Sequence, residues 1–230
     1  MKQSPILFKG PMVNAILAGQ KVQTRRIVKL RNGDTIGSID YGDGKREYII
    51  CDEDGDSVGF EFCCPYGAVG DHLLVKETWC PGYDHNPDDI SGDHKVSIIY
   101  NADNSTRCVT APSYELADDC SRNYSEDGFD NWHNKPSIFM PRWASRITLE
   151  ISAVRIERLQ DITEENAKAE GVEPICASEL ERIPVDILAR LNSLDVPLYV
   201  CGFYKTWVSL YGHESWWDNP FVWVVEFKRI

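Results

Sequence analysis

The last strand-like run of the chain limits the possible folds more than any other stretch. Residues 221–227 read Phe-Val-Trp-Val-Val-Glu-Phe, so both faces are apolar if the run is extended. Such a strand belongs in the middle of a sheet or barrel, where it is covered on both sides. Three other runs have strand-like patterns and can accompany it: residues 5–10, 73–79 and 147–156.

Short helices accompany these strands. Residues 11–17 begin with a proline that suits a first helical turn, carry apolar residues at the 3.6-residue period, and stop at Gly19. Residues 161–171 form a second helix, with Thr163 as the predicted N-cap and Gly171 as its end. The predicted fold class is therefore α+β.

Two stretches fit neither pattern and are expected to be additions to a single domain. Residues 82–135 are rich in Asp, Asn, Gly and Ser, with strand-like residues only near 96–100 and 108–110, which predicts a loop-rich insertion with a small hairpin. Residues 174–200 read as an irregular, partly helical segment before an amphipathic helix. A chain of 230 residues can bury one substantial core, so we expect one domain over 1–230.

Charge and composition restrict the partners. The net charge is −12, and duplex DNA binding depends on neutralising phosphates with Lys and Arg, so duplex DNA is not an expected partner. A local basic pocket can still hold one nucleotide. No run approaches the 18 apolar residues of a membrane span, and the N-terminus lacks the apolar core of a signal peptide. We expect a cytoplasmic protein that acts on a small molecule and does not bind membranes.

The eight cysteines are expected to be free thiols, because no signal peptide directs the chain to an oxidising compartment. A zinc site is the alternative. No Cys-x-x-Cys pair occurs, and two adjacent cysteines suit a tetrahedral site poorly. A zinc cluster would draw on Cys51, Cys63, Cys64, Cys80 and His72.

Residues 16–26, Ile-Leu-Ala-Gly-Gln-Lys-Val-Gln-Thr-Arg-Arg, hold a candidate reaction centre. A desolvated lysine can act as a base toward a hydroxyl nucleophile, which makes Lys21 and Thr24 candidate partners. Positions three apart point to opposite faces of a regular strand. The two side chains can share a pocket only if the backbone between Gly19 and Gln23 departs from a regular strand. Ordinary exposed strand residues are the alternative interpretation.

Further candidates lie elsewhere in the chain. Glu170 occupies the last turn of the second helix, where the helix dipole disfavours negative charge and so favours a proton donor. Glu77, at a strand end, can line a cavity or pair with an arginine. Arg142, Trp143 and Arg146 offer an aromatic plane and guanidinium groups suited to stacking a base or holding an anion, or else a tryptophan that anchors a barrel rim.

The order of these signals resembles the ASCH domain family of the PUA-like β-barrel superfamily. The resemblance is carried by Ile-Leu-Ala-Gly19, Lys21-x-x-Thr24-x-Arg26, Gly70-Asp71-x-Leu-x-Val, Leu-x-Asp-Ile-Thr163-Glu-Glu-Asn-Ala-x-x-Glu170 and the closing strand. The segment Met140-Pro-Arg-Trp-Ala-Ser-Arg146 is similar to enlarged members carried by bacteriophages and prophages. The resemblance implies a PUA-like mixed β-barrel with short flanking helices. It covers most of the chain outside 82–135 and 174–200.

Small bacterial members of this family are N4-acetylcytidine amidohydrolases. The resemblance implies that Lys21 is the proton acceptor, Thr24 the nucleophile and Glu170 the proton donor, without a metal or another cofactor. It implies a nucleoside or modified base as substrate. The substrate-binding candidates are Arg26, Glu77, Arg142, Trp143 and Arg146. Two alternatives are a PUA-like module that binds a modified base or single-stranded RNA without reacting, and a ribonuclease.

Overall fold

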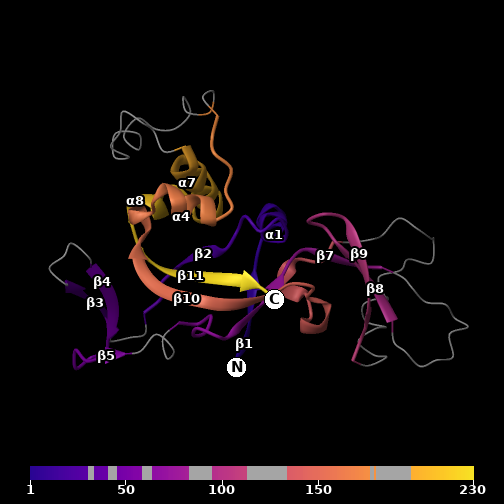
Figure 1. Ribbon diagram of the computed structural model, residues 1–230, viewed down its shortest axis with the longest axis horizontal. Helices are drawn as coiled ribbons and strands as arrows, with labels where there is room; N and C mark the ends of the chain where they lie inside the picture. Colours follow the sequence, from indigo (N-terminus) through magenta and orange to yellow (C-terminus); the bar gives the residue numbers. More distant parts are fainter. Residues whose placement is uncertain are drawn as a thin grey trace, which may run out of the picture. The chain divides into compact units, whose positions relative to one another are not determined.

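The computed structural model describes residues 1–30, 34–40, 46–58, 64–82, 95–112, 134–176, 179 and 198–230, which form strands in several sheets and few helices (Figure 1). The strands are β1 Gln3–Leu7, β2 Gln23–Ile27, β3 Thr35–Asp40, β4 Arg46–Cys51, β5 Ser57–Val58, β6 His72–Lys76, β7 Trp79–Gly82, β8 Lys95–Tyr100, β9 Ser105–Thr110, β10 Thr148–Arg158 and β11 Phe221–Arg229. The helices are α1 Gly10–Leu17, α4 Glu164–Ala169, α7 Leu198–Tyr211 and α8 Glu214–Trp217, with 3₁₀ helices η1 Ser137–Phe139, η2 Arg142–Ala144 and η3 Leu159–Asp161. The α+β class is confirmed.

The chain divides into two compact units. The first comprises residues 1–2, 15–71 and 150–229, and the second comprises 3–14, 72–149 and 230. In neither unit do the described strands close into a barrel, so the PUA-like barrel stays a prediction. This division into compact units does not test the number of domains, so the expected single domain over 1–230 also stays a prediction.

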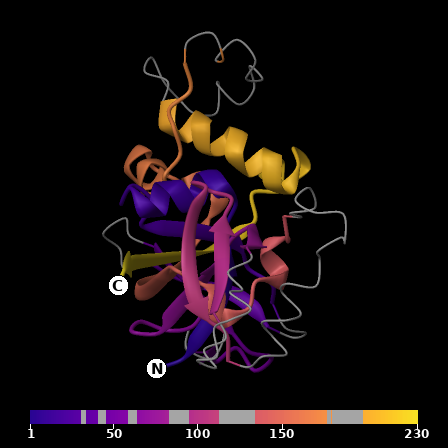
Figure 2. The same ribbon diagram turned by 90° about the vertical axis from the view of Figure 1, so that its right-hand side faces the viewer.

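The first unit is organised around β11, which lies between β10 and β2. Residues 222–225 of β11 are all buried, which confirms the expected strand with two covered faces. The helices α4, α7 and α8 gather on one side of these strands (Figures 1 and 2). The core between helices and strands contains Phe203, Trp207, Val222 and Val224. Apolar side chains on one stripe of α7 therefore cover one face of the sheet.

A smaller sheet of the first unit has the order β3-β4-β5. The sequence pattern of residues 30–62 predicts a hairpin around the acidic loop at 52–56, and this is confirmed where the chain is described, because β4 and β5 pair antiparallel across the loop. The Asp52 carboxylate accepts hydrogen bonds from the backbone N–H groups of Asp54 and Asp56, which is ordinary turn chemistry. Strand β3 was not predicted, because a glycine interrupts its alternating pattern. The second strand of this hairpin is expected over residues 58–62, of which 59–62 lie outside the described residues.

In the second unit, β1 pairs in parallel with β6, and β7, β8 and β9 form an antiparallel sheet. The β8–β9 hairpin, drawn in magenta in Figure 2, confirms the hairpin expected within the insertion. Its buried residues pack with Trp79, Met140 and Ala144.

Two predicted boundaries were wrong. The first strand was expected over 5–10, but β1 ends at Leu7 and α1 already begins at Gly10, with Pro11 in its first turn. The pattern of residues 20–28, with β-branched residues at 22, 24, 27 and 28, predicts an extended run, but the regular strand begins only at Gln23. Residues 83–94 and 113–133 of the insertion, and most of 174–200, lie outside the described residues.

In the described part of the chain, no helix is both long enough and apolar enough to cross a membrane.

Candidate functional site

Lys21 is held just before a strand by the end of α1. Gly19 adopts a left-handed conformation with φ of 74°, and the N–H groups of Gln20 and Lys21 both donate to the carbonyl of Ala15. This local pattern is a typical helix C-terminus, which the sequence predicted at Gly19. The backbone then forms a single bridge between Lys21 and Glu170 before β2 starts. The required departure from a regular strand between Gly19 and Gln23 is therefore present.

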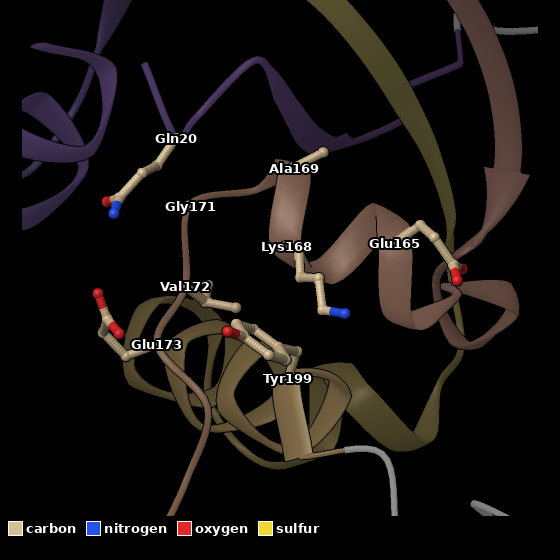
Figure 3. A pocket seen from close by; sticks show the side chains of 8 residues that line it. All are labelled: Gln20, Glu165, Lys168, Ala169, Gly171, Val172, Glu173 and Tyr199. Atoms are coloured by element: carbon tan, nitrogen blue, oxygen red, sulfur yellow. The ribbon is translucent and has the colours of Figure 1, made fainter. Parts of the chain in front are cut away.

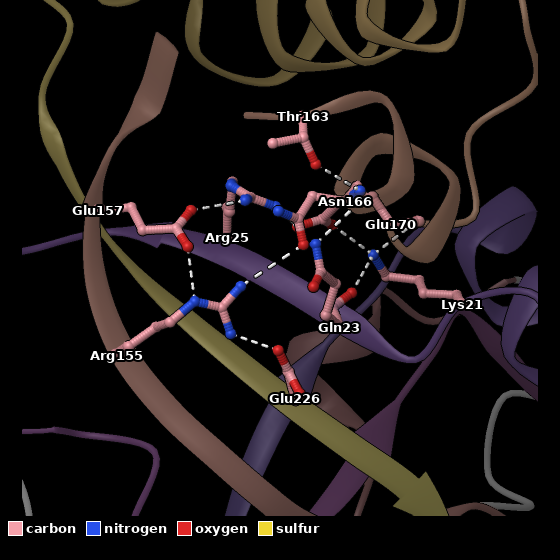
Figure 4. Close-up of polar contacts among 9 residues, drawn as sticks. All are labelled: Lys21, Gln23, Arg25, Arg155, Glu157, Thr163, Asn166, Glu170 and Glu226. Carbon is pink, nitrogen blue, oxygen red and sulfur yellow. Dashed lines mark hydrogen bonds and ion pairs between the residues drawn. The ribbon is translucent and has the colours of Figure 1, made fainter. Parts of the chain in front are cut away.

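The Lys21 amine makes three hydrogen bonds in a buried environment (Figure 4). Its Nζ lies 2.8 Å from a carboxylate oxygen of Glu170, Oε2, and 2.8 Å from each of the carbonyl oxygens of Glu170 and Gln23. Lys21 is 2% exposed and Glu170 is 5% exposed. The structure thus brings together two of the three predicted catalytic residues, 149 positions apart in the chain.

Glu170 reaches this position because of the way α4 begins and ends. Thr163 is the N-cap, with its hydroxyl accepting a hydrogen bond from the N–H of Asn166, as predicted. Gly171 follows the helix at φ of 69°. A Cβ atom on Gly171 would lie 2.6 Å from the Cβ of Lys21, so only glycine lets the two segments approach this closely. The helix stop and the Lys21–Glu170 contact are parts of one packing arrangement.

Burial has the largest effect on the protonation of Lys21. It lowers the pKa of Lys21 below the ordinary value for an amine. The Glu170 carboxylate opposes this effect through its charge and its hydrogen bond, whereas the guanidinium groups of Arg26 and Arg25 add to it. A lowered pKa favours the role of proton acceptor that the resemblance implies for Lys21.

The second oxygen of Glu170 is bound by Arg25. Arg25 Nη1 lies 3.2 Å from Glu170 Oε1, and Arg25 Nη2 lies 2.8 Å from Glu157 Oε2. The other carboxylate oxygen of Glu157, Oε1, forms an ion pair with Arg155, and Arg155 also pairs with Glu226. The result is a row of alternating charges from a fully buried end at Lys21 and Arg25 to a partly exposed end at Glu226 (Figure 4).

Thr24 lies on β2, with its backbone opposite Val225 of β11. Side chains of successive strand residues point to opposite faces, so Thr24 faces away from Gln23 and Arg25, whose side chains bond to α4. In the described part of the chain, no hydrogen bond joins the Thr24 hydroxyl to Lys21 or Glu170. The Lys21 amine nevertheless binds the carbonyl of Gln23, which immediately precedes Thr24. The structure therefore places Thr24 beside the pair in the chain but shows no direct contact with it.

Arg26 shares the Thr24 face of β2 by the same alternation. Its positive charge acts on Lys21 and also on Tyr66, where it opposes the rise in pKa that burial causes for the Tyr66 phenol. A guanidinium on this face is suited to an oxyanion or another anionic group. Its predicted role in substrate binding stays a prediction.

Glu77 and Arg146 contact each other in the second unit. The Nε and Nη2 atoms of Arg146 each lie 2.8 Å from one carboxylate oxygen of Glu77, and Nη1 binds Asp103 and Ser105. The guanidinium also lies over the Tyr100 ring at 4.1 Å. Of the two interpretations of Glu77, these contacts favour pairing with an arginine. Their role in substrate binding is untested, and their observed contacts fix the β8–β9 turn.

Arg142 and Trp143 also belong to the second unit. Arg142 is exposed and donates to the backbone and side chain of Gln3. Trp143 is partly buried against the cluster that contains Trp79 and Tyr100. This packing favours the anchoring interpretation of Trp143, and base stacking stays a prediction.

A cavity of about 460 Å³ opens beside α4 (Figure 3). It is lined by Gln20, Glu165, Lys168, Ala169, Gly171, Val172, Glu173 and Tyr199. The Lys168 amine lies 5.0 Å from the centre of the Tyr199 ring. Gln20 and Gly171 neighbour Lys21 and Glu170 in the chain, but neither Lys21, Thr24 nor Glu170 lines the cavity. It is a hollow lined in part by residues adjacent in the chain to the candidate pair.

No group of three or more His, Cys, Asp or Glu side chains that could hold a metal ion occurs among the described residues. Cys63, one member of the alternative zinc cluster, lies outside them, whereas Cys51, Cys64 and Cys80 lie within them. No family model, curated protein or solved structure matches this chain.

Sequence reasoning named Arg25 only as a charge that would lower the pKa of Lys21; it missed the contact of Arg25 with Glu170 and the presence of Glu157. Two signals were present: Arg25 alternates with Gln23 on one face of a strand, and Glu157 stands near the end of β10. Arg25 on β2 and Glu157 on β10 pair although β11 lies between their strands, so the strand order was needed to recognise the contact.

Proposed function

We propose that this protein is a cytoplasmic ASCH-type amidohydrolase that removes the acetyl group from N4-acetylcytidine to give cytidine. The observation that carries the proposal is the buried hydrogen bond of 2.8 Å between Lys21 Nζ and Glu170 Oε2. An amine and a carboxyl group in direct contact supply the acceptor and the donor that amide cleavage needs. Both belong to motifs through which the sequence resembles the ASCH family.

The pair changes state by moving one proton along this hydrogen bond. Transfer from Nζ to Oε2 converts an ammonium and a carboxylate into a neutral amine and a carboxylic acid. The neutral form contains the base and the acid together, and burial of Lys21 favours its amine over its ammonium. No proton has to enter from solvent for this step.

Acyl transfer then uses both members. The Thr24 hydroxyl, which does not contact Lys21 in the described structure, must first come within hydrogen-bond distance of the amine. The neutral amine of Lys21 then takes the hydroxyl proton of Thr24 while the Thr24 oxygen attacks the acetyl carbonyl carbon. The tetrahedral oxyanion forms near Arg26, whose charge stabilises it. The bond from carbon to nitrogen breaks, and the leaving nitrogen of cytosine takes the proton of Glu170. Lys21 is now an ammonium, Glu170 is a carboxylate and Thr24 carries the acetyl group.

Deacylation restores the starting state. The ammonium returns its proton to Glu170 through the same hydrogen bond. A water molecule attacks the acetyl-threonine and gives one proton to the neutral Lys21. The bond between carbon and Thr24 oxygen breaks, the oxygen takes the proton from Lys21, and acetic acid leaves. The net reaction is amide plus water to amine plus acid.

A non-catalytic binding module is the second candidate, and one observation favours it. All three hydrogens of a Lys21 ammonium have acceptors, so the ion pair is well satisfied in the absence of substrate. Such a protein would bind a modified nucleoside or single-stranded RNA and leave it unchanged.

The test is incubation of the purified chain with N4-acetylcytidine, with cytidine and acetate followed by liquid chromatography. We expect turnover in the wild type, loss of at least about 100-fold in Lys21→Met, Glu170→Gln and Thr24→Ala, and partial activity in the matched variant Thr24→Ser. Full activity in Thr24→Ala would remove the nucleophile assignment. Binding of the nucleoside without cytidine release by the wild type would favour the binding module.

A further inference from the structure

The most completely enclosed cation of the first unit's charge row is Arg25. Its side chain is 0% exposed, and its guanidinium lies between two carboxylates on different elements, Glu170 at the end of α4 and Glu157 on β10. The Phe203 ring lies 5.9 Å from the guanidinium carbon. The shape of this enclosure leaves the guanidinium little freedom to move.

We propose that Arg25 is the positioning residue of the Lys21–Glu170 pair, holding one carboxylate oxygen so that the other is the single proton path to Lys21. The proposal rests on the proposed function, because it assigns how the same site controls its proton. Arg25 takes Oε1 and Lys21 takes Oε2, so the carboxylate has a defined orientation. A carboxylate held by a planar guanidinium is fixed more tightly than one held by a flexible amine alone.

Arg25 also divides the negative charge of Glu170 between two cations. Among the described residues, the Lys21 ammonium is acted on by the charges of Glu170 at the end of α4 and of Arg25 and Arg26 on β2. Without Arg25, the whole charge of Glu170 would act on the Lys21 ammonium, and the pKa of Lys21 would be higher. Arg25 therefore favours the neutral amine of Lys21, which is the form that can accept a proton.

Glu157 has the opposite effect. Its carboxylate binds Arg25 Nη2 at 2.8 Å and so draws part of the guanidinium charge away from Glu170. Neutralising Glu157 would leave the full charge of Arg25 acting on Glu170 and Lys21. The two residues thus change the proton affinity of Lys21 with opposite signs, which a purely structural role would not produce.

The experiment measures the titration of Lys21 by nitrogen-15 NMR of its side chain in the full chain, assigned by loss of the signal in Lys21→Met. We expect Arg25→Met to raise the titration midpoint by about one pH unit, and Glu157→Gln to lower it. Arg155→Met is the matched control, because Arg155 also binds Glu157 but makes no contact with Glu170 in the described structure. Its midpoint should stay within about 0.3 unit of the wild type.

Two further readouts distinguish a variant that does not fold, a wrong role for Arg25 and a wrong proposed function. Glu157→Gln retains the guanidinium and its packing, so it tests the same step if Arg25→Met does not fold. Unchanged midpoints in folded Arg25 and Glu157 variants, or shifts of the same sign, would overturn the proposal. In an active enzyme, the pH limb of kcat/KM that belongs to Lys21 should move with the NMR midpoint. Shifted midpoints without turnover of N4-acetylcytidine by the wild type would instead overturn the proposed function and leave the positioning role intact.

Discussion

Replacing Gly171 by alanine tests whether Lys21 and the end of α4 touch as closely as the structure indicates. Gly171 has φ of 69°, and an added Cβ would lie 2.6 Å from the Cβ of Lys21 and 2.8 Å from the Cβ of Ala15. Gly212 ends α7 in the same way, with φ of 84°, but a Cβ there would meet nothing within 4 Å. The two substitutions share their backbone strain and differ in their steric contact.

The expected losses of unfolding free energy follow from these two contributions. A left-handed conformation costs a non-glycine residue about 1–2 kcal/mol, and this applies to both sites. Contacts as short as those at Gly171 add about 1–3 kcal/mol, because packed side chains must shift. We therefore expect a loss of about 2–5 kcal/mol for Gly171→Ala and about 1–2 kcal/mol for Gly212→Ala.

Urea unfolding followed by tryptophan fluorescence measures both variants under the same conditions. The midpoint of Gly171→Ala should fall below that of Gly212→Ala by about 0.5–1 M if the urea dependence is unchanged. Equal midpoints would refute the close approach of Gly171 to Lys21, and with it the packing that holds Lys21 against Glu170.

Three other perturbations have definite expected outcomes. Thr163→Ala removes the N-cap of α4 and should lower the unfolding free energy by about 1 kcal/mol in urea. Glu170→Gln removes the buried carboxylate that Lys21 and Arg25 share and should cost about 3–5 kcal/mol, against less than about 1 kcal/mol for the partly exposed Glu226→Gln. Arg146 lowers the pKa of Asp103 to about 2 from an ordinary 3.8, so this carboxylate stabilises the fold above about pH 4 and loses that contribution as the pH falls toward 2. The destabilisation caused by Asp103→Asn should accordingly shrink over that range, as urea titrations at several pH values will test.

Local signals predicted the parts of the fold that local forces determine. Gly19, Thr163 and Gly171 mark helix ends because left-handed backbone and N-cap hydrogen bonds depend on residues adjacent in the chain. The closing strand was recognisable because a strand covered on both sides must be apolar on both sides. Strand β3 was not predicted, because its glycine interrupts the alternation of apolar and polar residues that marks a strand.

The candidate site was predictable only in part, because its contacts join distant segments. The resemblance pointed to Lys21 and Glu170, and the structure brings them within 2.8 Å. The partner of Arg25 depends on the strand order, which puts β11 between β10 and β2 and is not encoded in either strand alone. Glu77 and Arg146 are 69 residues apart, so their pairing could be recognised only once the path of the chain between them was known. Each of these contacts forms only after the fold brings its partners together.

The buried end of the charge row is difficult to explain as a means of stabilising the fold. Transferring charges from water to a protein interior costs several kcal/mol per ion, and apolar residues of similar volume often stabilise a core equally well or better. The exposed end, at Arg155 and Glu226, does not incur this full cost, because solvent still reaches both side chains. Lys21, Arg25 and Glu170 do incur it, and each makes further contacts that orient it toward the others. Perturbed, buried ionisable groups of this kind concentrate at functional sites, so chemistry accounts for this end of the row better than stability does.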